Sequence, residues 1–369
     1  MKIGILTSSR ADYGIYKPLL KALHADPFFE VHMIVFGSHL MPAFGMTVDE
    51  IEADGYTIDH RVDAMPKDDS PEGISAAIGK IIQKFSEIWQ VSNFDLVFAL
   101  GDRFEMFAAV VSGLPFNIRF AHIHGGETTK GAIDDAFRHS ISLMSSLHFA
   151  STVPYKQRIA QIIGREKNIY NTGALGMDYI KSVALLSKEE FTDKYNIDLS
   201  LPTILSTIHP ETVSFRQNEG FIDAYVEAMK AALEFQVVIT MPNADTSGKI
   251  IREKLQMLAT DRPGIFLIEN FGSKDYLSCM KYCEMLIGNT SSGFYDASFF
   301  PKWVINLGDR QSGRIRTPNI LDVSFETREI LKAISIVSGK QVPVFDPVYG
   351  DGHAAEKIVK ILKDEVNTN

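Results

Sequence analysis

The stretch "IGILTSSRADYG", residues 3–14, sets the pattern from which the fold can be read. An apolar run over residues 3–7 ends in a polar turn, and a helical pattern follows over residues 13–25. The run is continuously apolar rather than alternating, which is typical of a parallel strand buried on both faces. A strand that leads through a short turn into a helix is the first half of a βαβ unit.

The same pattern recurs in two blocks along the chain. In the first block, strands are expected at residues 3–7, 31–37, 56–62, 96–101, 120–125, 148–151 and 169–173. In the second block, they are expected at residues 203–209, 237–240, 265–270, 285–289 and 304–308. Helical patterns separate them, for example at residues 73–91, 103–113, 132–146, 218–233 and 248–260. We therefore predict an α/β chain of two Rossmann-like, doubly wound domains that face each other across a cleft.

The break between the blocks falls in a helix-like and then loop-like stretch at residues 175–200. We place the N-terminal domain at residues 1–178 and the C-terminal domain at residues 179–352. An amphipathic helical pattern over residues 353–366 follows a Gly-Asp-Gly turn. We expect this tail, residues 353–369, to pack back on the first domain.

Composition excludes several classes of protein. With 45% apolar and 22% charged residues, the chain of 369 residues is not of the disordered class. Its net charge of −9 makes a nucleic-acid partner unexpected. No apolar run approaches the ~20 residues of a membrane span, and the N-terminus does not read as a signal peptide. We expect a cytoplasmic protein whose two cysteines, Cys279 and Cys283, are core thiols.

Ligands of doubly wound sheets bind beyond the carboxyl ends of the strands, so residues there are the candidates for chemistry. Arg10, in the turn before the first helix, is either an anion-binding group or a surface arginine. Asp102 follows a strand and either points into the cleft or caps a helix.

The segment "HIHGGETTKGAIDDAFRH", residues 122–139, concentrates histidines and carboxylates at a strand end and a helix start. Asp134 lies in the first helical turn, where the helix dipole favours a carboxylate, and it is four residues from Arg138. An ordinary helix pair is therefore one interpretation, and an acid/base site is the other. His122, His124 and Glu127 match no recognised metal-ligand spacing, so we do not expect a metal.

The second block carries a different set of residues. His209 ends a strand before a proline, and Asn243 lies in a turn before a helix. In "IGNTSSGFYDASFFP", residues 287–301, small hydroxylated residues open a helix, an arrangement that suits a diphosphate. Asp296 comes one turn later, where it could accept ribose hydroxyls, and Arg310 follows the next strand. Because no G-x-G-x-x-G occurs, no dinucleotide cofactor is expected.

Together these segments resemble the UDP-N-acetylglucosamine 2-epimerase family, and its hydrolysing branch in particular. The matching segments are "SSRADYG" (8–14), "GDR" (101–103), "GGETTKGAIDDAFRH" (125–139), "IHP" (208–210), "PN" (242–243), "GNTSSG" (288–293) and "INLGDRQSGR" (305–314). The resemblance implies a glycosyltransferase-B-like fold, a UDP-sugar substrate, UDP as a product, no cofactor, and a homo-oligomer, either a dimer or a tetramer. It also implies a role in making sialic-acid-type or legionaminic-acid-type sugars.

The resemblance assigns roles to individual residues. It implies that UDP is bound by Arg10, Arg103, Asn243, Tyr276, Thr290, Ser291, Ser292, Asp296 and Arg310. It implies that catalysis involves Asp102, Glu127, Asp134, His209 and His124. Many relatives have a glutamate at the position of His124, in the forms "HIEGG" or "HVEAG". Either Glu127 reaches the site in its place or His124 takes over proton transfer, and of the two we expect Glu127.

The implied reaction converts UDP-N-acetylglucosamine, or UDP-2,4-diacetamido-2,4,6-trideoxyglucose, to the free manno-configured sugar and UDP. It proceeds by elimination to a 2-acetamidoglucal and addition of water. The sequence leaves the choice of sugar open. The alternatives are a non-hydrolysing 2-epimerase, a UDP-sugar-dependent glycosyltransferase and, last, a nucleotide-sugar sensor without turnover.

Overall fold

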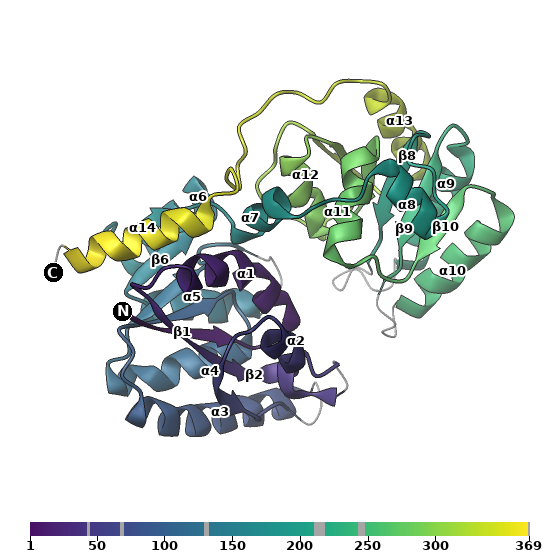
Figure 1. The fold of residues 1–369 in the computed structure, drawn as a ribbon. Coiled ribbons are helices and arrows are strands. Elements are labelled where there is room, and N and C mark those ends of the chain that lie inside the picture. Colours follow the sequence, from purple (N-terminus) through teal and green to yellow (C-terminus); the bar gives the residue numbers. More distant parts are fainter. Residues whose placement is uncertain (43–44, 67–69, 129–132, 210–217, 243–247, 368–369) are drawn as a thin grey trace. The chain divides into compact units, whose positions relative to one another are not determined.

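The computed structural model describes residues 1–42, 45–66, 70–128, 133–209, 218–242 and 248–367. The chain divides into two compact units, which Figure 1 shows with the elements labelled. The first unit contains Met1–Lys181 and Tyr349–Asn369, and the second contains Ser182–Val348. The expected boundaries at residues 178 and 352 lie close to these. Helix α7 (Leu175–Ser182) runs through the first of them, so the chain leaves the first unit only at the end of that helix.

The first unit is built on a seven-stranded sheet in the order β3-β2-β1-β4-β5-β6-β7. Its strands are β1 (Lys2–Thr7), β2 (Glu30–Phe36), β3 (Ile58–Val62), β4 (Leu96–Leu100), β5 (Phe120–Ile123), β6 (Leu147–Ala150) and β7 (Ile169–Asn171). All neighbouring strands pair in parallel. The order is that of a doubly wound fold, and it reverses direction between β1 and β4.

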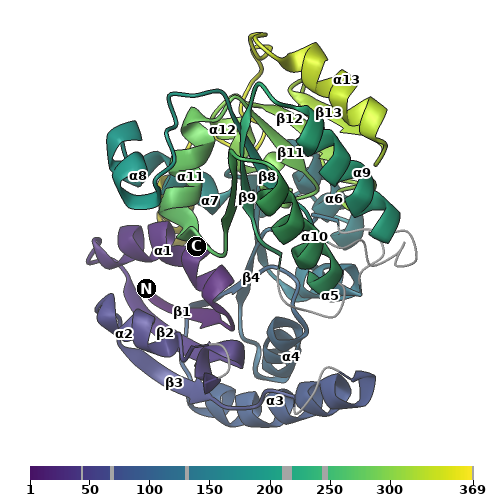
Figure 2. The ribbon, with the colours of Figure 1, turned by 90° about the vertical axis from the view of Figure 1, so that its right-hand side faces the viewer.

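Helices cover both faces of this sheet, and each face has its own apolar core. The helical elements are α1 (Arg10–His24), η1 (Gly37–Leu40), α2 (Val48–Ala53), α3 (Pro71–Val91), α4 (Phe104–Gly113), η3 (Leu114–Phe116), α5 (Asp134–Met144), α6 (Val153–Ile163), α7 and α14 (Ala354–Asn367). Residues of α1 and α14 contribute to one core, and residues of α3 and α4 contribute to the other. Helices α3 and α4 pack against each other, as Figure 2 shows. Burial on both faces explains why these strands are continuously apolar in the sequence.

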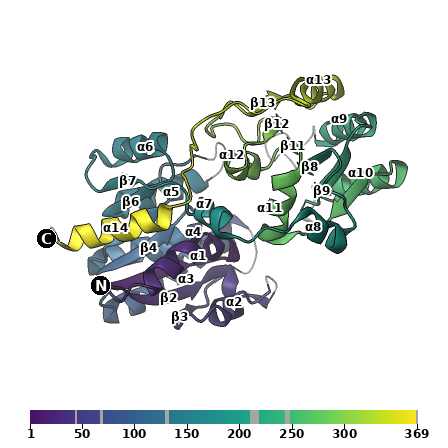
Figure 3. The ribbon, with the colours of Figure 1, turned by 45° about the horizontal axis from the view of Figure 1, so that its top comes forward.

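The C-terminal segment returns to the first unit. Helix α14 packs against α1, and the two can be followed side by side in Figure 3. The buried carboxylate of Asp178 accepts hydrogen bonds from the N–H groups of Ala354 and Ala355, at 2.8 and 2.7 Å. These are two of the N–H groups that a helix start leaves without an internal partner, so Asp178 fixes the beginning of α14.

The second unit repeats the plan with a six-stranded sheet in the order β10-β9-β8-β11-β12-β13. Its strands are β8 (Thr203–Thr207), β9 (Gln236–Thr240), β10 (Ile265–Ile268), β11 (Met285–Gly288), β12 (Trp303–Leu307) and β13 (Ile320–Val323). Its helical elements are α8 (Lys188–Tyr195), α9 (Asn218–Ala231), α10 (Gly248–Asp261), α11 (Gly272–Tyr282), η5 (Ser291–Gly293), α12 (Asp296–Phe299) and α13 (Thr327–Val337). These strands also pair in parallel, and the order reverses between β8 and β11.

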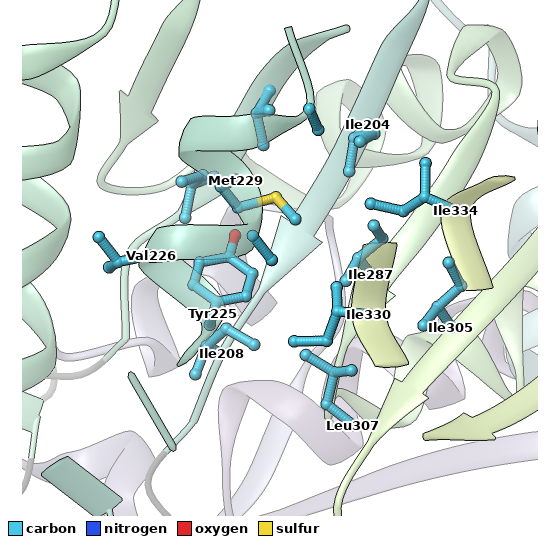
Figure 4. Packing of buried hydrophobic residues seen from close by; sticks show 14 of the residues in the cluster. Ile204, Ile208, Tyr225, Val226, Met229, Ile287, Ile305, Leu307, Ile330 and Ile334 are labelled. Atoms are coloured by element: carbon cyan, nitrogen blue, oxygen red, sulfur yellow. The ribbon is translucent and has the colours of Figure 1, made fainter. Parts of the chain in front are cut away.

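The predicted fold class is confirmed, since both units are doubly wound α/β structures. Figure 4 shows part of one core of the second unit, where Tyr225 and Met229 of α9 pack among isoleucines from the strands and α13. Cys279 and Cys283 are free and buried in the other core, as expected. Strand β13 was not predicted. It is a short edge strand with partly exposed side chains, so its apolar signal is weak.

Candidate functional site

The two places where strand order reverses carry most of the predicted site residues. In the first sheet, β1 leads into Arg10 and β4 leads into Asp102. In the second sheet, β8 leads into His209 and β11 leads into Thr290. Ligands of doubly wound sheets bind at such topological switch points, at the carboxyl ends of the strands. Each unit therefore offers a candidate binding region of its own.

In the first unit, three carboxylates gather around one buried arginine. We call Asp102, Glu127, Asp134, His124 and Arg138 the carboxylate cluster. The Arg138 guanidinium forms ion pairs with Asp102 and, at 3.4 Å, with Glu127. Its side chain is only 8% exposed, so these pairs are shielded from solvent. The sequence suggested an ordinary helix pair between Asp134 and Arg138, but Arg138 instead bridges residues from two other segments.

Asp134 begins helix α5 and is partly buried. Burial, followed by the nearby negative charge of Asp102, raises the pKa of the Asp134 carboxyl, and Arg138 and Arg103 partly oppose that rise. The sequence predicted that the helix dipole would favour the ionised form of this group. In the folded unit, burial and the charge of Asp102 outweigh that effect, so Asp134 holds a proton more readily than an ordinary aspartate.

Glu127 is almost fully buried and is held from three sides. Its Oε1 accepts a hydrogen bond from the Ser151 hydroxyl at 2.8 Å and lies 3.1 Å from Nδ1 of His124. Its Oε2 accepts from Arg138 at 3.4 Å. Ser151 follows β6, the strand next to β5, so the sheet itself brings this hydroxyl to Glu127. The sequence offered no signal for Ser151.

The glycine pair after His124 allows the chain to turn this tightly. Gly126 has φ +78°, and a Cβ at this position would lie 2.4 Å from the carbonyl oxygen of Tyr155. A Cβ at Gly125 would lie 2.9 Å from both the His122 ring and the Ser142 hydroxyl. Only glycine fits both positions, so the "HGGE" segment is required by the backbone as well as by any chemistry.

His122 is engaged in the interior and does not point to a metal. Its Nε2 lies 2.8 Å from the carbonyl oxygen of Gly101, and its Nδ1 lies 2.9 Å from the Ser142 hydroxyl. Burial lowers the pKa of His122 to about 3, so the ring is neutral. Nε2–H then donates to the Gly101 carbonyl, and Nδ1 accepts from Ser142. In the described part of the chain, no group of three or more His, Cys, Asp or Glu side chains is arranged to hold a metal ion.

Arg10 and Arg103 are placed differently from each other. Arg10 is the first residue of α1, its side chain is 68% exposed, and its Nε lies 3.6 Å from a Glu50 carboxylate oxygen. Arg103 occupies the N-cap position of α4 without a side-chain capping bond, and its guanidinium contacts the fully buried Glu105 carboxylate at 2.6 Å. Beside Arg10, Asp12 accepts hydrogen bonds from Ser8 and Ser9 and so shapes the turn between β1 and α1.

In the second unit, Asn289 organises the switch point. Its side chain is fully buried and forms two hydrogen bonds with the backbone of His209, from His209 N–H to Oδ1 at 2.7 Å and from Nδ2 to His209 C=O at 2.8 Å. The Asn289 carbonyl oxygen accepts from Arg310 at 3.1 Å and from Gln311 at 2.9 Å. One residue thus joins the end of β8 to the loop after β12. The sequence reasoning missed both Asn289 and Gln311.

The segment after β11 is less helical than predicted. The sequence indicated one helix opened by Thr290, Ser291 and Ser292, whereas the structure has the three-residue 3-10 turn η5 and the four-residue helix α12. Thr290 caps the turn by accepting from Ser292 N–H at 3.4 Å. The phenolic oxygen of Tyr276 lies 2.5 Å from the Ser292 hydroxyl, so α11 and this turn are joined. A macrodipole from so short a helix is small, and local N–H groups and hydroxyls are the donors available for an anion.

Asp296 opens α12 and has a perturbed carboxyl group. Burial raises the pKa of Asp296 to about 7. The residue as a whole is only partly buried, but the pKa rise shows that its carboxyl group is withdrawn from solvent. A group poised between its two protonation states can either accept or donate a hydrogen bond. The remaining predicted residue, Asn243, lies outside the described residues.

The comparisons with known proteins agree with this architecture. The family model described as UDP-N-acetylglucosamine 2-epimerase matches residues 21–363. A relative from Legionella pneumophila, named UDP-N,N'-diacetylbacillosamine 2-epimerase (hydrolyzing), is 32% identical, and the match covers 98% of this chain and 95% of the relative. One from Campylobacter jejuni, named GDP/UDP-N,N'-diacetylbacillosamine 2-epimerase (hydrolyzing), is 35% identical over 87% of this chain and 84% of its own length.

A solved structure shares the fold. The UDP-GlcNAc 2-epimerase from Neisseria meningitidis, bound to UDP-GlcNAc, has a TM-score of 0.83 at 19% identity. The match covers 99% of this chain and all of that one. With the family model spanning nearly the whole sequence and the fold glycosyltransferase-B-like, the chain belongs to the UDP-N-acetylglucosamine 2-epimerase family.

Proposed function

We propose that this protein is a hydrolysing 2-epimerase that converts a UDP-2-acetamido sugar to the free manno-configured sugar and UDP. The observation that carries the proposal is the carboxylate cluster at the switch point of the first sheet. A binding module for a nucleotide sugar has no need of three carboxylates around a buried arginine. Membership of the family, and the names of relatives that are 32% and 35% identical, support the reaction class.

The chemistry explains why such a cluster is needed. The proton on C2 of the sugar is not acidic, because no carbonyl group adjoins that carbon. Elimination avoids a free carbanion, since the bond from C1 to UDP breaks while a base removes the C2 proton. The resulting 2-acetamidoglucal then takes up water at C1 and a proton at C2 from the opposite face. The reaction needs at least one base, one proton donor and stabilisation of the departing diphosphate.

The first unit supplies the groups for proton transfer. Burial and the charge of Asp102 raise the pKa of Asp134, which suits it to donate a proton to C2. Asp102 pairs with Arg138, and we propose that Asp102 accepts the proton released by the attacking water. In this assignment Arg138 keeps two carboxylates, Asp102 and Glu127, in place at the same time.

The second unit supplies the groups for UDP. We assign the diphosphate to Thr290, Ser291, Ser292 and Arg310, and the ribose to Asp296. His209, whose backbone is fixed by Asn289, is assigned to the departing phosphate. Tyr276, bonded to Ser292, is assigned to the uracil side of this region. Arg10, Arg103 and Asn243 stay predicted contacts to UDP, and the homo-oligomer stays a prediction.

Of the two sugars that the sequence left open, we favour UDP-2,4-diacetamido-2,4,6-trideoxyglucose. Two relatives at 32% and 35% identity carry N,N'-diacetylbacillosamine in their names, and this is the same diacetamido sugar. The structure of the Neisseria meningitidis protein holds UDP-GlcNAc, but at 19% identity its likeness supports the fold alone.

Initial rates of UDP release test the proposal and the choice of sugar together. Purified protein is given each UDP-sugar separately, without added metal or nicotinamide cofactor, and kcat/KM is compared. We expect release of UDP from both and at least about tenfold higher kcat/KM for the diacetamido sugar, a difference of about 1.4 kcal/mol in transition-state binding. No release of UDP from either sugar contradicts the proposed function. A preference for UDP-N-acetylglucosamine contradicts the choice of substrate alone.

The second candidate is the non-hydrolysing 2-epimerase, which would return a UDP-linked product. Phosphorus NMR of the same reaction distinguishes the two, because free UDP and a UDP-sugar give different β-phosphate signals. We expect the signal of free UDP to grow in proportion to sugar conversion. Conversion at C2 with the UDP linkage intact would favour the second candidate.

A further inference from the structure

His124 combines two unusual features in one residue. Its backbone has φ +63°, in the left-handed region that residues with a Cβ rarely adopt. Its ring nitrogen Nε2 is buried and has no hydrogen-bond partner in the described part of the protein. Buried polar atoms without partners and strained backbones are both uncommon, and both concentrate at functional sites.

The backbone does not require a histidine at this position. A glycine would adopt φ +63° without strain, and two glycines follow directly in the sequence. The backbone N–H of His124 donates to the Phe149 carbonyl at 3.1 Å, a bond that any residue other than proline could make. The backbone strain at residue 124 is therefore tolerated for the sake of the imidazole side chain.

Glu127 fixes the orientation of that imidazole. His124 Nδ1 lies 3.1 Å from Glu127 Oε1, and the same carboxylate also accepts from Ser151 and Arg138. A carboxylate surrounded by donors acts as an acceptor, so Nδ1 carries the hydrogen and Nε2 presents its lone pair. Both Glu127 oxygens are engaged by neighbouring donors, whereas Nε2 of His124 has no partner in the described part of the protein, so the imidazole is the group left to accept a proton.

We propose that His124, oriented by Glu127, is the base that removes the C2 proton, and that Glu127 acts only through His124. The inference rests on the proposed function and revises the expectation that Glu127 reaches the substrate. His124 stands at the carboxyl end of β5, which is paired with β4, the strand that leads into Asp102. The pair His124–Glu127 would then remove the C2 proton, a role for which many relatives are expected to use a single glutamate.

In the proposed reaction, every proton and electron pair passes to a named group. His124 Nε2 takes the C2 proton, and the electrons of that C–H bond form the double bond between C1 and C2. The bond from C1 to the β-phosphate oxygen breaks, and its electron pair leaves with UDP. Asp134 then gives a proton to C2 on the opposite face while water adds at C1 and loses its proton to Asp102. His124, Asp102 and Asp134 re-equilibrate with solvent, so one water is consumed for each free sugar and UDP formed.

A double-mutant cycle tests the proposal. The variants are His124→Gln, Glu127→Gln and the combination, with His139→Gln as the control, since His139 is a partly buried histidine of α5 that has no assigned role. We expect His124→Gln to lower kcat by about 10²–10⁴-fold, the usual contribution of a general base, and to leave KM within about twofold. Adding Glu127→Gln to it should lower kcat no further, because Glu127 has lost the group through which it acts.

Two kinetic results would contradict the role proposed for His124. If Glu127→Gln abolishes turnover while His124→Gln keeps more than about a tenth of kcat, Glu127 is the base and the proposal is wrong. Effects that multiply in the double variant also overturn it, because they show two independent groups. A failure of the proposed function is recognised separately, because in that case the wild type itself turns over neither UDP-sugar.

Nitrogen-15 NMR of the histidine rings gives a readout that does not depend on turnover. In wild type at neutral pH, we expect His124 to carry its hydrogen on Nδ1, and in Glu127→Gln we expect that preference to weaken or reverse. His139→Gln should leave the His124 signals unchanged. A wild-type ring with hydrogen on Nε2 alone contradicts the proposed orientation, because that nitrogen could not accept the C2 proton.

Discussion

Replacing Arg138 by methionine should destabilise the first unit strongly. The Arg138 and Glu127 side chains are each 8% exposed and that of Asp102 is 23% exposed, so both ion pairs are largely shielded from water. Methionine fills much of the same volume but leaves two carboxylates without their counter-charge. Removing one partner of a buried pair typically costs about 3–5 kcal/mol, and we expect Arg138→Met to fall in that range at neutral pH.

The assay is urea unfolding followed by circular dichroism, with the transition of the first unit analysed separately if two transitions appear. With a slope of about 2–3 kcal/mol/M, the midpoint should fall by about 1–2.5 M at neutral pH. Arg119→Met is the matched control, because Arg119 is 50% exposed and lies 4.0 Å from Glu365, so its loss should cost below about 1 kcal/mol. A neutral-pH effect of Arg138→Met no larger than that of the control would mean that the ion pairs of Arg138 stabilise the first unit no more than an exposed pair does.

Three further results are expected. Gly126→Ala should destabilise the fold by more than about 2 kcal/mol, because the added Cβ would lie 2.4 Å from the Tyr155 carbonyl oxygen. The control is Gly164→Ala, at φ +73° with no atom within 4 Å of the added Cβ, which should cost only the left-handed strain of about 1–2 kcal/mol. Thermal unfolding of both variants checks this difference. Asp134→Asn should raise the free energy of unfolding at neutral pH, since the raised pKa of Asp134 makes its ionised form unfavourable in the fold, and it should reduce turnover. Urea midpoints should show that this gain in stability disappears as pH falls below about 4, where the carboxyl of the unfolded chain is also protonated. Burial raises the pKa of Asp296 to about 7, so UDP affinity measured by calorimetry should weaken as pH falls from about 8 to about 6. This weakening should be steeper in wild type than in Asp296→Asn. Parallel curves for the two proteins would argue against a ribose contact from the ionised group.

Much of the fold could be predicted because burial on two faces leaves a strong pattern. Strands β1 to β12 each occupy an expected segment, and their continuously apolar sequences reflect helices packed on both sides of each sheet. Strand β13 escaped prediction because an edge strand is covered less and needs fewer apolar residues. The helix expected from Thr290 is interrupted, which shows that a capping residue marks where a helix can begin but not how long it runs.

The site was only partly predictable for a related reason. Candidate residues at strand ends could be identified, because topology alone places them at the switch points. The residues that hold them were missed, since Ser151, Asn289 and Gln311 act over long sequence separations and match no local pattern. Arg138 was noticed, but helical spacing suggested Asp134 as its partner, and tertiary packing joined it to Asp102 and Glu127 instead.

Proton NMR in deuterated water distinguishes the proposed hydrolysing 2-epimerase reaction from simple hydrolysis of the UDP-sugar. The purified protein is incubated with UDP-2,4-diacetamido-2,4,6-trideoxyglucose, and the products are followed over time. We expect free UDP together with a free manno-configured sugar that carries deuterium at C2, because elimination discards the original C2 proton and solvent supplies its replacement. A free sugar of unchanged configuration that retains hydrogen at C2 would mean simple hydrolysis and would contradict the proposed 2-epimerase reaction.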